Sequence, residues 1–78
     1  MIEPGATIRL RIPRICFYPQ GHERRATDHG PLIPRATRLF YVCPYPGRPG
    51  IHLAETHFDV VMGVRWEVPF QLDELAEL

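Results

Sequence analysis

Proline is the residue that most restricts how this chain can fold. Nine prolines and six glycines are distributed over 78 residues. Because proline lacks a backbone N–H and breaks helix interiors, this content argues against a helical bundle and favours short strands separated by turns. A chain of this length builds one small domain with a thin core. We therefore expect residues 1–78 to form a single domain and exclude a two-domain enzyme, a coiled coil and a dinucleotide-binding fold.

The apolar residues are too scattered to form a membrane span. No run approaches the roughly 20 apolar residues that cross a bilayer, and no charged-then-apolar leader resembles a secretion signal. We therefore expect a cytoplasmic protein without membrane association.

Charge is balanced overall but segregated along the chain. All nine basic residues are arginines, and nine acidic residues match them. Residues 1–40 hold seven arginines and three acids, whereas residues 41–78 hold two arginines and six acids. Arginine pairs bidentately with carboxylates and phosphates. The two halves therefore either steer the chain toward a charged partner or satisfy each other within the fold.

Four segments are predicted to be strands because they alternate in hydropathy or are rich in β-branched and aromatic residues. They are residues 7–12, 36–43, 51–55 and 65–70. The last of these gathers Trp66 with its apolar neighbours and assigns it to the core. Pro69 indicates that this strand lies at an edge or breaks there. The three prolines and two glycines of residues 44–50 predict a stiff turn.

Two further stretches lack strand periodicity. Residues 15–18 could form a short continuation of the preceding strand, but Pro19, Gly21 and Pro31 then interrupt the segment. We interpret residues 14–35 as a long loop that folds back over the rest of the domain. The final residues place Leu72, Leu75 and Leu78 at a spacing of three, which predicts a short 3-10 or helical turn that packs through its leucines.

This order of elements predicts a mainly β fold. Several phrases along the chain also resemble the small SH3-like proteins of phages, prophages and proteobacteria, most of which have no assigned function. The phrases are Pro4-Gly5 before Ile8-Arg9-Leu10, the segment from Ala36 to Val42, Gly50 to Glu55, and Val68 to Leu75. The resemblance implies an SH3-like barrel of four to five antiparallel strands with a long first loop and a C-terminal 3-10 turn. A full SH3 order has a fifth strand after that turn, and here the chain stops at Leu78.

The thiols and imidazoles do not have the spacing of a metal site. Cys16, Cys43 and four histidines are present without a C-x₂-C or H-x₃-H pair. The two cysteines are free thiols, a disulfide if their strands pair, or metal ligands, and the sequence leaves these alternatives open. We expect no metal and no cofactor. Because so thin a core cannot hold a preorganised catalytic centre, we also expect no enzymatic activity and assign no catalytic residues.

The candidate partner-binding residues lie in the predicted loop and in the proline-rich turn. Polar residues cluster after His22, where Arg24 and Arg25 can pair with carboxylates or phosphates. The resemblance to SH3-like domains places Tyr18 and Tyr45 beside an aromatic peptide groove. The full set that we select is Tyr18, His22, Arg24, Arg25, Tyr45 and Arg48.

These features predict a non-enzymatic protein-binding module. The resemblance implies that it is encoded by a phage or mobile element and modulates a host protein, and an anti-CRISPR-like inhibitor is one form. One alternative is a small nucleic-acid-binding barrel that uses the arginine-rich N-terminal half, although a pI of about 6.9 opposes non-specific affinity for phosphate. Another is a phage structural component or a homodimer. The predicted oligomeric state is a monomer or a homodimer.

Overall fold

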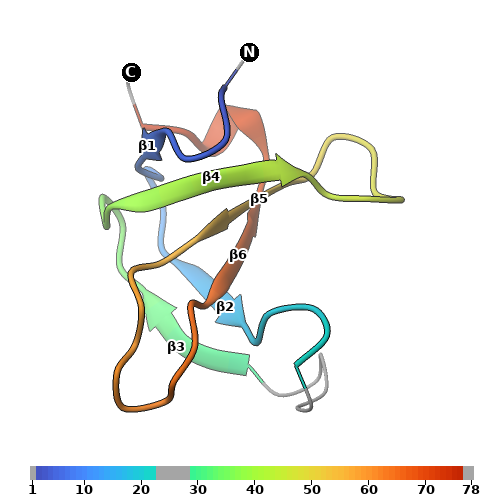
Figure 1. The fold of residues 1–78 in the computed structure, drawn as a ribbon. Coiled ribbons are helices and arrows are strands. Elements are labelled where there is room, and N and C mark those ends of the chain that lie inside the picture. The colour runs from blue at the N-terminus through green and yellow to red at the C-terminus, as the bar shows by residue number, and fades with distance from the viewer. Residues whose placement is uncertain (1, 23–28, 77–78) are drawn as a thin grey trace.

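The computed structural model describes residues 2–22 and 29–76 of the chain. In these residues, six short strands form one antiparallel sheet, followed by a single 3-10 turn (Figure 1). The strands are β1 (Thr7–Ile8), β2 (Arg14–Phe17), β3 (His29–Ile33), β4 (Leu39–Pro44), β5 (His52–Glu55) and β6 (Glu67–Phe70), and the turn is η1 (Leu72–Glu74). Their order across the sheet is β1-β4-β5-β6-β2-β3. The predicted mainly β fold is confirmed.

The centre of the sheet is built from β4, β5 and β6, which correspond to three of the predicted strands. Ala54 in β5 is opposite Tyr41 in β4 and Val68 in β6. β4 begins at Leu39 instead of residue 36, because the backbone turns first. Ala36 has a φ of 66°, and its N–H donates to the Leu10 carbonyl at 2.8 Å.

The strand predicted over residues 7–12 is shorter than expected. Only Thr7 and Ile8 pair with β4, and Leu10 forms an isolated bridge with Leu75. Ile12, expected on the buried face, is 39% exposed. The alternation therefore describes the burial of Ile8 and Leu10 but not a continuous strand.

The prediction of a long loop over residues 14–35 is wrong. This segment supplies β2 and β3, which pair with each other from Arg14 opposite Ile33. A register shift follows between Ile15 and Phe17. The described residues thus contain six strands instead of the predicted four to five.

The sheet is open, with β1 and β3 as its outer strands. β6 lies inside the sheet and not at an edge, contrary to one interpretation of Pro69. On the β2 side, however, β6 pairs only through Glu67 opposite Phe17. Pairing on that side has therefore ended before Pro69, where the missing N–H would interrupt a ladder.

One cluster of buried side chains forms the core and includes residues from every strand except β3. Trp66 is 4% exposed, as predicted, and Phe70 is 1% exposed. The other members are Ile8, Leu10, Cys16, Leu39, Tyr41, Ala54, Val64 and Val68. The part of the chain described here has no helix long and apolar enough to cross a membrane.

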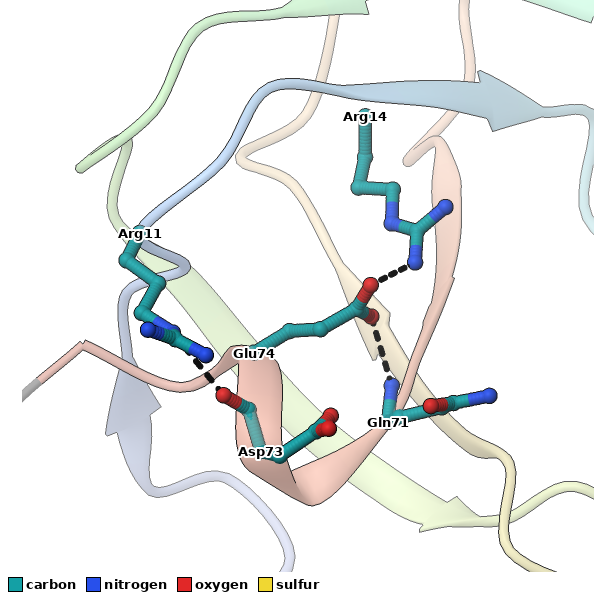
Figure 2. Close-up of polar contacts among 5 residues, drawn as sticks. All are labelled: Arg11, Arg14, Gln71, Asp73 and Glu74. Carbon is teal, nitrogen blue, oxygen red and sulfur yellow. Dashed lines mark hydrogen bonds and ion pairs between the residues drawn. The ribbon is translucent and has the colours of Figure 1, made fainter.

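The predicted 3-10 turn is confirmed at η1, and it is fixed to the segment that precedes β2. Figure 2 shows the Arg11 side chain beside the Asp73 carbonyl, which accepts from Nε at 2.9 Å. The Glu74 carboxylate accepts from the Gln71 backbone N–H at 2.8 Å and forms an ion pair with Arg14.

The leucines of this C-terminal segment behave differently from one another. Leu75 packs against the core, whereas Leu72 is 51% exposed. Leu78 lies outside the described residues.

Candidate functional site

An open groove of about 700 Å³ lies between the end of β2, the β4–β5 turn and the end of β6. We call it the aromatic groove. Four of the predicted contact residues line it, namely Tyr18, His22, Tyr45 and Arg48. Arg24 and Arg25 lie outside the described residues. The order of the strands explains why these residues converge. β6 lies between β5 and β2, so the segment after β2, with Tyr18 and His22, and the turn before β5, with Tyr45 and Arg48, form two walls of the same groove.

The first wall is a stack of rings that begins in the core. The Tyr18 and His22 rings are stacked, with centroids 4.9 Å apart and planes inclined at 25°. The Tyr18 ring centroid also lies 4.6 Å from that of the buried Trp66 ring, with the two planes inclined at 57°. Tyr18 is therefore positioned by a core residue, and it presents a fixed aromatic surface to the groove.

The opposite wall is the proline-rich turn. The Tyr45 N–H donates to the Ile51 carbonyl at 2.9 Å, and the Arg48 N–H donates to the Tyr45 carbonyl at 3.1 Å. Gly47 and Gly50 have φ values of 76° and 81°, a region that glycine adopts without strain. This geometry places the Arg48 guanidinium 5.1 Å from the Tyr45 ring centroid, where the cation is attracted to the face of the ring.

Two arginines and one glutamate are the charged residues among the described residues that line the groove. Arg14 and Arg48 both line it. The Arg14 guanidinium is paired with Glu74, while its buried Nε has no hydrogen-bond partner among the described residues. Burial raises the pKa of Glu67, the lining carboxyl, against the lowering effect of a hydrogen bond from the Gln20 backbone. Burial thus disfavours the charged form of the lining carboxylate relative to that of an exposed glutamate.

A second cavity, which the sequence did not reveal, lies on the opposite face of the β4–β5 pair from the aromatic groove. This apolar pocket has a volume of about 540 Å³ and is lined by Ile2, Pro4, Tyr41, Val42, Cys43, Pro44, His52, Leu72 and Leu75. Tyr41 is opposite Ala54 and Cys43 is opposite Leu53, which leaves Val42 as an extra residue in a β-bulge. The bulge allows the consecutive Val42 and Cys43 side chains to line the same pocket.

One polar pair lies in the wall of the apolar pocket. Tyr41 Oη and His52 Nδ1 are joined by a hydrogen bond of 2.8 Å. Burial raises the pKa of Tyr41, so the phenol stays neutral. The sequence alternation of β5 is confirmed here, because Ile51 and Leu53 line the aromatic groove whereas His52 faces the apolar pocket.

Both cysteines are free thiols, and they occupy different environments. The Cys16 thiol is fully buried and donates to the Pro31 carbonyl at 3.1 Å. Burial raises its pKa to about 11. The disulfide alternative is wrong because β2 and β4 are not neighbours in the sheet. Among the described residues, no three His, Cys, Asp or Glu side chains gather as a metal site would require.

Part of the arginine-rich N-terminal half is engaged in contacts within the chain. Arg9 donates to the Ala36 carbonyl at 2.6 Å. Arg11 bonds the Asp73 carbonyl, and Arg14 pairs with Glu74. These three guanidinium groups satisfy partners within the chain, so the basic half is only partly available to a phosphate backbone.

No protein-family model, curated protein or solved structure matches this chain. Its function must therefore be inferred from the groove and the other surfaces of the molecule.

Proposed function

We propose that this protein is a non-enzymatic, SH3-like protein-binding module that holds an extended peptide segment in the aromatic groove. The single observation that carries the proposal is the convergence of Tyr18, His22, Tyr45 and Arg48 on that groove. Two tyrosine walls and flanking prolines offer apolar surface at low entropic cost, as peptide grooves do. A host protein bound by a phage-encoded modulator is one form of this function.

The charge of the groove defines the kind of peptide. Arg48 is exposed and lies over Tyr45, and a guanidinium group can pair bidentately with a carboxylate. The preferred segment therefore carries an acidic residue beside apolar or aromatic ones. Nucleic acid is a less suitable ligand, because three arginines of the basic half already bind within the chain.

The proposal is tested by selecting ligands from a library of short random peptides and measuring their affinity by calorimetry. The wild-type protein is expected to select acidic, apolar-rich peptides. Arg48→Glu and Tyr45→Ala are each expected to weaken binding by about tenfold or more. Arg35→Glu reverses an exposed charge outside the groove and is the matched control, with unchanged affinity.

The outcome that contradicts the proposal is a selected peptide whose affinity is insensitive to Arg48→Glu and Tyr45→Ala. Exchanging Arg24 and Arg25 together for Glu tests the two predicted contact residues that lie outside the described residues, and we expect lost binding with a Tm within a few degrees of wild type. A single-stranded oligonucleotide is measured in parallel. Tight binding of the oligonucleotide that falls steeply with added salt would support the nucleic-acid alternative.

A further inference from the structure

The loop between β5 and β6 exposes four large apolar side chains to solvent. Val60 and Val61 are 83% and 87% exposed, and Phe58 and Met62 are 52% and 47% exposed. We call these four residues the apolar tip. A contiguous exposed apolar surface of this kind is typical of an interaction site, whereas single exposed apolar residues are ordinary.

The apolar tip is held in a defined conformation by Asp59. Its Oδ1 accepts from the Val61 and Met62 backbone N–H groups, both at 3.0 Å. Its Oδ2 accepts from the Trp66 indole N–H at 3.0 Å. The Gly63 N–H closes the turn on the Asp59 carbonyl at 2.7 Å. Because the loop is fixed before any contact, little conformational entropy is lost when the apolar tip is buried.

The apolar pocket described above matches the apolar tip in chemistry. None of its lining residues is an arginine, aspartate or glutamate, and His52 already bonds Tyr41. Its volume of about 540 Å³ is sufficient for several aliphatic side chains. Each surface therefore offers the other a partner without unpaired buried charge.

A single molecule cannot bring these two surfaces together. Figure 1 shows the β5–β6 loop at the lower end of the view, whereas the N-terminal segment, η1 and β1 lie at the upper end. An apolar tip that fills the apolar pocket must therefore belong to a second copy of the chain.

The charges that border the two surfaces support this arrangement. Glu3 and Asp73 are exposed and adjoin residues that line the apolar pocket. His57 and Arg65 are exposed at the two ends of the loop that carries the apolar tip. Two carboxylates thus border one surface and the Arg65 guanidinium the other, and this opposition of charge favours a head-to-tail arrangement of two copies.

We propose that the apolar tip of one copy docks in the apolar pocket of the next copy. The contact is heterologous, because each molecule uses one surface as donor and the other as acceptor, so association continues into short chains. A contact made through the four side chains of the apolar tip is small beside the roughly 20–30 residues that each partner contributes to a stable interface. Association is therefore expected to be weak, with a dissociation constant on the order of 100 µM.

Sedimentation of the full chain measures this association. Wild-type protein is expected to form dimers and longer species as the concentration rises toward about 1 mM. Val60→Asp/Val61→Asp changes two solvent-exposed side chains and is expected to be folded and monomeric. Leu32→Asp places a charge on a different exposed leucine, 57% exposed in β3, and is the matched control that still associates.

Mixing two variants distinguishes the head-to-tail contact from a symmetric one. Leu72→Asp places a charge in the wall of the apolar pocket at a side chain that is 51% exposed. Each variant alone is expected to be monomeric. An equimolar mixture of Leu72→Asp with Val60→Asp/Val61→Asp retains one intact tip and one intact pocket, so it is expected to form heterodimers and nothing larger.

A disulfide trap locates the contact. Val61→Cys places a thiol on the apolar tip, and mild oxidation is expected to join it to Cys43 in the pocket of a neighbour. The dimer should be lost in Val61→Cys/Cys43→Ser. A wild-type protein that stays monomeric at about 1 mM, a mixture that forms no heterodimer, or a crosslink that persists without Cys43 would each overturn the proposal.

Discussion

Gly30 provides the sharpest test of how this small core is packed. A Cβ at this position would lie 2.6 Å from two carbons of the Trp66 ring and 2.8 Å from the Cys16 sulfur. Gly30 has a φ that other residues adopt freely, unlike the five glycines of positive φ. The cost of Gly30→Ala is therefore steric, because both neighbours are buried and neither can swing into solvent.

The magnitude follows from the size of the overlap. The two contacts fall roughly 1 Å short of ordinary van der Waals separation, and overpacking of this kind costs about 1–3 kcal/mol. We expect a loss near 2 kcal/mol in the free energy of unfolding. In a chain of this size each kcal/mol lowers the Tm by roughly 4–8 °C. The Tm of Gly30→Ala should therefore fall by about 8–16 °C.

Urea unfolding followed by the fluorescence of Trp66, the single tryptophan, measures this loss. Leu32→Ala truncates an exposed side chain in the same strand and is expected to change stability by less than about 0.5 kcal/mol. Cys16→Ala removes one of the two clashing groups. The double variant with Gly30→Ala should thus be less destabilised than the sum of the single variants, by about 0.5 kcal/mol or more. Wild-type stability of Gly30→Ala, or strict additivity, would refute the reasoning.

Three further predictions concern ionisable groups. With a disulfide reagent at pH 8, only the Cys43 thiol of the native protein should react, and the Cys16 thiol should react only on unfolding. Rapid reaction of both thiols in the native protein would contradict the burial of Cys16. The hydrogen bond from the Trp66 indole lowers the pKa of Asp59. The stabilisation that the Asp59 carboxylate contributes is therefore complete above the ordinary pKa of 3.8 and is lost as the pH falls through the lowered pKa of the folded state. The free energy of unfolding of Asp59→Asn should consequently fall less than that of wild type when the solution is acidified. Burial raises the pKa of Glu67, so Glu67→Gln should raise the Tm at pH 7. Below the ordinary pKa of 4.5 the wild-type carboxyl is already neutral, and the two proteins should have the same Tm. Equal Tm values at pH 7 would contradict this prediction.

The central strands could be predicted because their patterns are local. Residues 51–55 alternate between the aromatic groove and the apolar pocket, as the sequence indicated. The leucine spacing at the C-terminus likewise predicted η1. Such patterns depend only on which side chains are apolar and on the period of the backbone.

The β2–β3 pair could not be predicted because its burial comes from the rest of the chain. In β2 the fully buried side chain is Cys16, while the more apolar Ile15 is 39% exposed. β3 is an outer strand that contains Gly30 and Pro31, residues that normally indicate a turn. At the edge of a sheet a proline is tolerated, and the glycine is needed because Trp66 lies against it.

Four of the six predicted contact residues line one groove, while Arg24 and Arg25 lie outside the described residues. Tyr18 and Tyr45 lie on opposite walls only because β6 separates β5 from β2, an order that no local pattern encodes. The apolar pocket depends on the bulge at Val42, and a bulge changes the register of a strand without changing its composition.

The position of Trp66 joins regions of the molecule that are otherwise separate. Its ring contacts Tyr18 in the groove, and its indole nitrogen bonds Asp59 beneath the loop tip. Tyr18 and Asp59 are therefore connected through one rigid group, the Trp66 indole. If a ligand bound at one of these sites changes the affinity at the other, the reverse effect has the same factor, as linkage requires. The fluorescence of this single tryptophan would report ligand binding at either site without an added label.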